Sequence, residues 1–175
     1  MTKKTIRKQE PTFTQAINIS KDWCNEWEED LLSDEVLADR IQELIKTKIG
    51  IRGFFAYTLS DSECTLLDKL PSSLIYKFRE LGEDIVEITI KNFFMSSAQI
   101  INHQNNKKYE YVEISNNISE RCISLLKELD SKLVTKKINK MVANIDKLGN
   151  GFDSKVKYTS EQKNYILNKI EKLIK

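Results

Sequence analysis

The sequence predicts a mainly α protein, folded as a single-domain bundle of about six to seven helices. Apolar side chains recur at three- and four-residue spacing along most of the chain, which is the period of one helix face. The 175 residues are 40% hydrophobic and include only two prolines, so the chain is long and apolar enough for one buried core. No apolar run approaches the roughly 18 residues that a bilayer-spanning helix requires.

Apolar faces and capping residues indicate the first two helices. One helix is expected over 14–31, with Trp23 and Trp27 on its apolar face as anchors of the core. A second helix is expected to begin at a polar cap at 33–34, with acidic residues in its first turn. Gly50 is expected to end this second helix in the left-handed conformation.

The middle of the chain contains three segments of ambiguous pattern. Aromatic and β-branched residues at 51–59 suit either a minor strand or a buried piece of helix. Pro71 is expected in the first turn of the following helix, and Gly82 is expected to end it. A long helix is predicted over 83–104, although β-branched residues leave 85–90 open between strand and helix. The alternating residues at 107–114 then suit either a connector or an edge strand, so a strand or hairpin at 51–59 and 107–114 stays open.

The last third of the chain is predicted to be helical. An apolar seam runs over 118–148 and is expected to bend near 130–131, and glycines end it at 149–151. Thr159 and Gln162 have the spacing of a capping box, which predicts a final helix.

Composition divides the chain into three parts. Residues 1–11 are expected to be a flexible basic N-terminus, 12–148 a helical core domain, and 149–175 a turn with a basic C-terminal helix packed on the core. The basic N-terminus lacks the apolar segment of a secretory signal, which predicts a cytoplasmic protein.

The only histidine of the chain lies on a polar stripe of the long helix. The stripe members are spaced four, three and four residues apart, and we interpret them as a candidate polar seam or interaction surface: Asn92, Ser96, Gln99 and His103. A hydrogen-bonded seam between helices is favoured over a polar groove for a partner or small ligand. A catalytic or metal-binding role is least favoured, because no second ligand lies three or four residues from the histidine.

Charge is distributed unevenly along the chain. Residues 21–90 carry 8 Lys and Arg against 16 Asp and Glu, whereas 131–175 carry 11 Lys against 4 acidic residues. A candidate basic surface in the second segment would suit a nucleic-acid backbone, and it comprises Lys132, Lys136, Lys137, Lys140, Lys155 and Lys157. An AT-rich genome is the favoured explanation for a chain so rich in Lys, Ile and Asn, and a binding surface is the alternative.

Residue types that support metal or phosphate chemistry are present without a matching pattern. Cys24, Cys64 and Cys122 have no zinc-binding spacing and are expected to be buried thiols. Helical carboxylate pairs that suit Mg²⁺ occur at 26/29, 80/83 and 84/87, although solvated helix faces are the favoured interpretation. The sequence therefore predicts no catalytic residue, no cofactor and no metal site.

Three runs resemble a small helical family of cyanobacteria whose function is uncharacterised: RGFFAY at 52–57, IKNFFMSSAQIINH at 90–103 and SERC at 119–122. The resemblance covers about residues 23–130 and leaves the Lys-rich tail outside. It implies a photosynthetic lineage as the source and implies no activity and no site residue.

The main functional hypothesis is a non-enzymatic helical protein-interaction or regulatory module that binds another protein or self-associates. Opposite charges on 21–90 and 131–175 would then meet head to tail or within one chain. Non-specific nucleic-acid binding through the Lys-rich C-terminal segment is the first alternative. An Mg²⁺-dependent nucleotide pyrophosphohydrolase is the second. No membrane span is expected.

Overall fold

The computed structural model describes residues 10–146 and 157–174, and within these ranges the chain forms eight α-helices and no strand. Helices make up 79% of the described residues, which confirms the mainly α prediction, although the helix number exceeds the six to seven expected. The helices are α1 (Phe13–Glu28), α2 (Asp34–Ile45), α3 (Lys48–Ser60), α4 (Ser72–Leu81), α5 (Glu83–Asn105), α6 (Tyr109–Glu128), α7 (Ser131–Ala143) and α8 (Ser160–Ile174).

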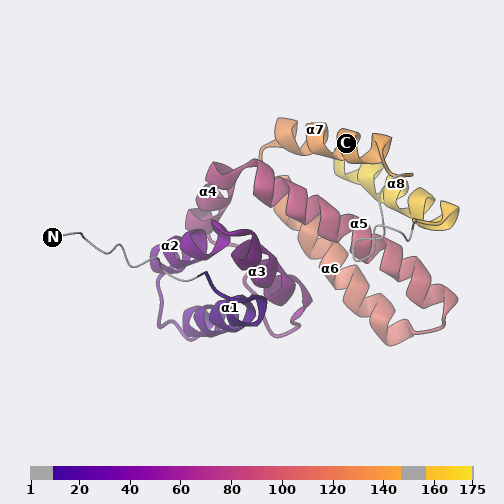
Figure 1. The fold of residues 1–175 in the computed structure, drawn as a ribbon. Coiled ribbons are helices and arrows are strands. Elements are labelled where there is room, and N and C mark those ends of the chain that lie inside the picture. The colour runs from indigo at the N-terminus through magenta and orange to yellow at the C-terminus, as the bar shows by residue number, and fades with distance from the viewer. Residues whose placement is uncertain (1–9, 147–156, 175) are drawn as a thin grey trace.

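Figure 1 shows two groups of helices joined through α5. The first four helices pack together, with α3 against α1 and α2, and α4 against α2. The long α5 and α6 form an antiparallel hairpin, and α7 and α8 lie along α5 on the side away from the first group. α5 therefore contacts α4, α6, α7 and α8.

The strand alternative at 51–59 is wrong, because this segment lies inside α3. Thr47 caps the helix by accepting a hydrogen bond from the backbone nitrogen of Gly50 at 2.9 Å, so this glycine lies in the first turn of α3 and does not end α2. Most of α3 is buried on several sides, between α1, α2 and α6. Burial on several sides removes the one-face pattern that distinguishes a helix from a strand.

The strand alternative at 107–114 is also wrong, because α6 begins at Tyr109. Lys107 has a φ of 55° and forms the turn between α5 and α6. The large side chains of Tyr109, Tyr111 and Ile114 are exposed at the start of α6. Because these side chains are not buried, their spacing is not constrained to the helical period, and the sequence therefore did not identify this segment as a helix.

Several helix ends lie where their capping residues predicted them. Gly82 has a φ of 48° and separates α4 from α5, a conformation that favours glycine. The bend expected near 130–131 is a break between α6 and α7, where the Asp130 side chain accepts from the Leu133 nitrogen at 2.7 Å. The capping box is confirmed, since the Thr159 nitrogen donates to Gln162 at 2.9 Å and the Gln162 nitrogen donates back at 3.2 Å.

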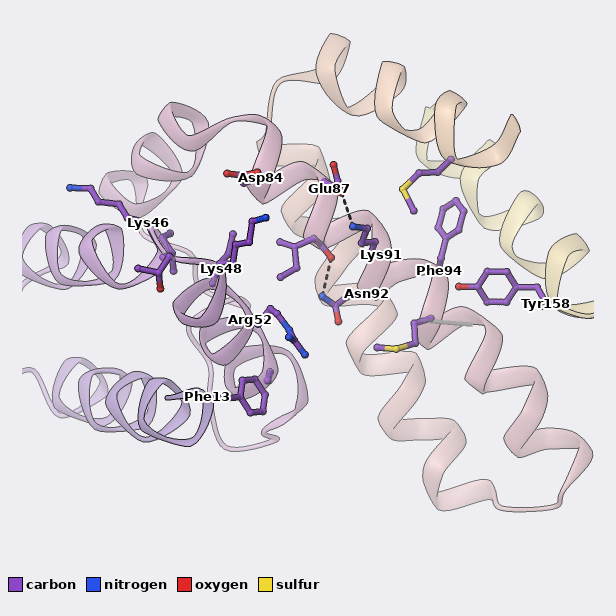
Figure 2. A pocket seen from close by; sticks show the side chains of 17 residues that line it. Phe13, Lys46, Lys48, Arg52, Asp84, Glu87, Lys91, Asn92, Phe94 and Tyr158 are labelled. Carbon is purple, nitrogen blue, oxygen red and sulfur yellow. Dashed lines mark hydrogen bonds and ion pairs between the residues drawn. The ribbon is translucent and has the colours of Figure 1, made fainter. Parts of the chain in front are cut away.

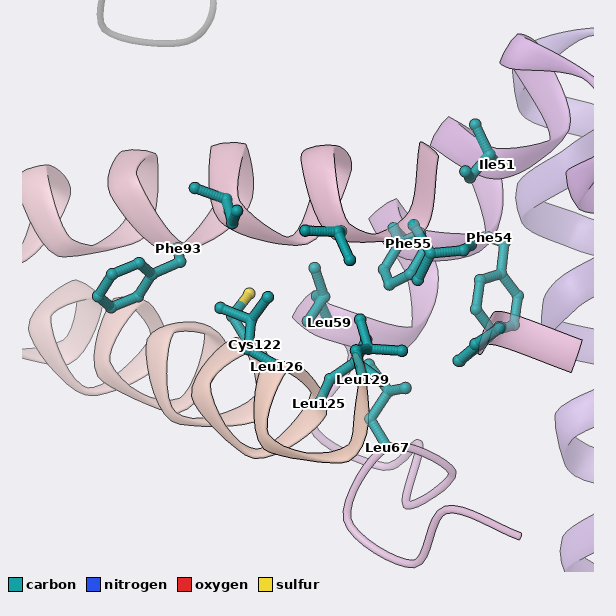
Figure 3. Packing of buried hydrophobic residues seen from close by; sticks show 14 of the residues in the cluster. Ile51, Phe54, Phe55, Leu59, Leu67, Phe93, Cys122, Leu125, Leu126 and Leu129 are labelled. Carbon is teal, nitrogen blue, oxygen red and sulfur yellow. The ribbon is translucent and has the colours of Figure 1, made fainter. Parts of the chain in front are cut away.

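Aromatic side chains of α3 form the centre of the core (Figure 3). The rings of Phe54 and Phe55 meet edge to face with centroids 5.3 Å apart, and Phe78 of α4 lies 5.9 Å from Phe54. Leucines of α6 pack on the other side of these rings. Trp23 and Trp27 are only partly buried at the edge of the core, so phenylalanines, not tryptophans, anchor it.

α1 and α3 approach each other at backbone contact. A Cβ atom at Gly53 would lie 2.4 Å from the Cβ of Ala16 and 3.1 Å from the Ile17 nitrogen. A side chain of any size at Gly53, or one larger than a methyl group at position 16, would separate the two helices. This contact positions Phe13 at the start of α1 beside Arg52 of α3, with the guanidinium 5.6 Å from the centroid of the ring.

Arg121 of α6 binds the C-terminal end of α3. Its Nη1 donates to the backbone oxygens of Thr58, Leu59 and Asp61 at 3.1, 3.3 and 2.8 Å. Its Nη2 donates to the backbone oxygen of Cys64 at 2.7 Å, and the guanidinium pairs with Asp68 at 2.7 Å. The last carbonyls of a helix have no partner within the helix, so this guanidinium fixes α3 against α6.

We predict that Gly53→Ala destabilises the protein by about 1 to 3 kcal/mol, because the added methyl group overpacks the α1–α3 contact. The same change would normally stabilise a helix by about 1 kcal/mol, so the sign of the effect reports the contact. Urea unfolding followed by circular dichroism measures it. Combining the change with Ala16→Gly should recover part of the loss, and equal stability of Gly53→Ala and the native protein would contradict the contact.

Arg121→Lys is predicted to destabilise the protein by about 2 to 4 kcal/mol, because an ammonium group cannot reach the carbonyls and Asp68 together. Arg79→Lys is the matched control, since its guanidinium makes a single exposed contact with the Glu128 backbone oxygen at 2.8 Å. Thermal and urea unfolding of both variants give the comparison. If Arg121→Lys lowers the free energy of unfolding no more than the control does, the bonds from Arg121 to the end of α3 are not needed for stability.

Candidate binding groove

A groove lies over α5, between the first group of helices and the C-terminal part of the chain (Figure 2). Its volume is about 630 Å³. α5 forms the floor, α1 and α3 with the α2–α3 connection form one wall, and α7 with Tyr158 forms the other. The apolar side chains that line it are Phe13, Ile45, Ile51, Ala56, Ile88, Phe94, Met95, Met141 and Tyr158.

The floor of the groove is the one open strip of α5. The strip members are half-buried and recur at four-, three-, four- and four-residue spacing: Ile88, Asn92, Met95, Gln99 and His103. α6, α7 and α8 pack on the other sides of α5, which explains its many fully buried side chains. The first three members of the strip line the groove, and the last two extend it toward the end of α5.

The structure separates the four residues of the predicted polar stripe: three lie on the open strip, and Ser96 is buried. Asn92 lies in the groove and donates to the Ile88 backbone oxygen at 2.9 Å. Ser96 is buried and donates to the Phe93 backbone oxygen at 3.2 Å. Gln99 accepts from Asn102 at 3.0 Å. The His103 ring lies against Tyr111 of α6 with centroids 5.4 Å apart. Three stripe members are thus on the open strip, and their role as an interaction surface stays a prediction.

The polar contact between helices is formed by residues that the sequence did not single out. The hydroxyl groups of Ser97 on α5 and Ser119 on α6 are 3.2 Å apart. Lys169 of α8 donates to the Ser119 hydroxyl at 3.0 Å and pairs with Glu120 at 3.0 Å. The only signal in the sequence was the run of small residues at 96–98, which allows close approach on either face.

Charged side chains line the rim of the groove. On α5, Glu87 pairs with Lys91 at 2.6 Å and with Lys137 of α7 at 3.4 Å. The two ammonium groups hold the pKa of Glu87 below its ordinary value. On the opposite wall, Lys48 and Arg52 lie exposed on α3 and have no ion pair among the described residues. The wall formed by α3 is therefore the cationic side of the groove.

The predicted basic surface is only partly available as a surface. Lys137 points into the structure and also pairs with Glu83 at 2.8 Å, which lowers the pKa of that carboxyl. Three lysines of α7 form an exposed row at four-residue spacing: Lys132, Lys136 and Lys140. Lys157 is exposed before α8, and Lys155 lies outside the described residues.

At least one member of each carboxylate pair is engaged with a basic or amide group. Glu26 pairs with Arg40 at 3.0 Å, and Glu80 accepts from Gln42 at 3.0 Å. Glu83 and Glu87 share Lys137, as described above. In the ranges that the structure describes, no group of three or more His, Cys, Asp or Glu side chains is placed to hold a metal ion.

All three cysteines are buried, which confirms the prediction of core thiols. Burial alone raises the pKa of Cys122, so its thiol stays protonated. A hydrogen bond with the neighbouring Cys64 thiol, together with burial, raises the pKa of Cys24.

Comparison with known proteins places the chain in a family. Residues 12–173 match the family described as Uncharacterised conserved protein UCP020893. The chain belongs to this family. The resemblance to an uncharacterised family is thereby confirmed, and the match reaches beyond 23–130 to include α8 and the Lys-rich tail. A cyanobacterial source stays a prediction.

No curated protein and no solved structure matches the chain. Across the described residues, none of the helices is both long and apolar enough to cross a bilayer.

Proposed function

We propose that the protein is a non-enzymatic interaction module that receives an amphipathic helix of a partner protein in the groove over α5. The observation that carries this proposal is the groove itself, an open and mainly apolar trough of about 630 Å³ with a helix as its floor. Helix-in-groove recognition uses an apolar floor between two walls, with anchors spaced at three, four and seven residues.

The length of the groove suits a short helix. Its floor extends from Asp84 to Met95, which corresponds to a rise of about 16 Å along α5. That distance equals about three turns of a partner helix lying along α5. The open strip continues through Gln99 to His103, where Tyr111 adds an exposed ring. A continuous strip of this length favours a polymer chain over a compact small molecule.

The apolar lining suits adaptable binding. Phe13 is 44% exposed at the mouth of the groove, although it is a large apolar side chain. Met95 lies on the floor and Met141 on the wall, and methionine side chains adjust their shape to different apolar partners. Burying these side chains under a partner would remove apolar surface from water, which favours association.

Two polar groups on the floor of the groove, Asn92 and Glu87, are engaged within the protein and favour a binding role over a catalytic one. Asn92 is hydrogen-bonded to its own helix, and Glu87 is held by two lysines. A general base or nucleophile needs a free polar group directed at the substrate. A cytoplasmic location, expected from the sequence, belongs to the same proposal and is tested by cell fractionation.

Selection from a displayed library of random peptides of about 16 residues tests this function, since three turns plus flanks fit that length. We expect peptides with apolar residues at helical spacing, and Met95→Glu should weaken their binding about ten-fold or more by placing a charge under the apolar anchors. Leu31→Glu is the control, because that side chain is 68% exposed and outside the groove. Fluorescence anisotropy measures affinity, and circular dichroism checks the fold.

Two results would contradict the proposal. The first is a selection that yields no binder, and the second is a set of binders with equal affinity for Met95→Glu and the native protein. Light scattering of the protein alone separates partner binding from self-association.

Nucleic-acid binding is a second candidate function, favoured by the exposed row of Lys132, Lys136 and Lys140. If the row contacts a phosphate backbone, affinity for a labelled duplex should fall steeply between about 50 and 200 mM salt. Replacing all three lysines by glutamine should abolish binding and leave the groove peptides unaffected. An affinity that is independent of salt or of the triple replacement rules this candidate out.

A further inference from the structure

We infer that the helix received by the groove is acidic, and that Lys48 and Arg52 select it by charge. This inference rests on the proposed function and specifies the chemistry of the partner. It follows from three observations on α3 and on the opposite rim.

The first observation is that the two cations lie one turn apart on α3 and have no ion pair among the described residues, although neighbouring lysines do. Lys46 pairs with Glu43, and Lys91 pairs with Glu87 at 2.6 Å. Arg52 is instead held over the ring of Phe13, so its guanidinium stays at the mouth of the groove. Figure 2 shows Lys48 and Arg52 on the same side of the groove, with Lys48 extending toward the start of α5 and Arg52 toward Phe13. A carboxylate entering there would meet two prearranged positive groups.

The second observation is the charge at the start of α3. The first turn of α3, like those of α1, α4 and α7, contains no acidic residue, and it begins with Lys48, whereas α2 and α5 each begin with two acidic residues. The N-terminal end of a helix carries partial positive charge, which disfavours a cation there. An external anion beside Lys48 would relieve this repulsion. The isolated protein thus lacks, at this end of α3, the negative charge that α2 and α5 supply for themselves.

The third observation is that most negative charge on the opposite rim is already neutralised. Glu87 is shared by Lys91 and Lys137, and the second of these ammonium groups also binds Glu83. Asp84 remains in the first turn of α5, at one end of the floor. A basic partner would find one carboxylate there and two opposing cations on α3. The charge of the groove therefore favours an acidic helix with its carboxylates toward α3.

The test compares binders selected from the random peptide library on the native protein. Selected peptides should be enriched in Asp and Glu on one side of the apolar anchors. The double variant Lys48→Glu with Arg52→Glu should bind them about ten-fold more weakly, and a selection on that variant should yield basic peptides. Lys127→Glu with Lys172→Glu is the charge-matched control, because both lysines are exposed and lie outside the groove. Raising the salt concentration should weaken native binding and abolish the difference between the two variants.

The outcomes separate this inference from the function on which it rests. Peptides that need Met95 but are neutral or basic, or that ignore the reversal at 48 and 52, overturn the acidic partner and leave the groove function standing. The absence of any groove-dependent peptide overturns both. Displacement of the peptides by dodecanoate at far lower concentration identifies a small amphipathic anion as the occupant, and it also overturns the assignment of a partner helix.

Discussion

The structure depends on the way α5 is enclosed. This helix is in contact with α4, α6, α7 and α8, and its buried residues are distributed over most of its circumference. Covering an apolar helix on several sides requires neighbours both before and after it in the chain, so neither half of the protein buries α5 alone. One strip, from Asp84 to His103, is left uncovered. The groove is thus a consequence of how many helices surround α5, and not a separate addition to the fold.

Close packing of the helices removes backbone and side-chain polar groups from water, so these groups need hydrogen-bond partners within the protein. Arg121 supplies them at the end of α3, where four backbone carbonyls would otherwise lie near the core without donors. Lys169 and Ser119 supply them where α8 crosses α5 and α6. Among the described residues, no buried side-chain nitrogen or oxygen lacks a hydrogen-bond partner. The long-range polar contacts therefore fix the relative positions of helices that apolar packing alone leaves free to slide.

Local signals in the sequence were sufficient to predict where helices with one exposed face begin and end. Asp130, Thr159 and Gly82 mark helix ends through bonds or backbone angles within a few residues of themselves, so their effect is readable without the fold. α3 could not be predicted as a helix, because a helix buried on several sides has no single apolar face to give the helical spacing. The stripe containing His103 was recognised, but its openness was not, since that depends on where distant helices such as α1, α3 and α7 lie beside α5. Arg121 bonds to residues about 60 positions away, a distance no local pattern reports.

The uneven charge of the chain is partly satisfied within the fold. Lys137, Lys163 and Lys169 of the basic segment pair with Glu87, Asp146 and Glu120. Each of these lysines has most of its side chain covered, so it acts more as a link between helices than as a free surface charge. The cations without an ion pair among the described residues include the outer row of α7 and the two on the α3 wall of the groove. Only the second set lies beside an apolar trough, where an opposite charge would be partly shielded from water and would therefore interact more strongly. Composition alone does not distinguish the two sets as binding groups, whereas the fold places only one of them beside an apolar groove.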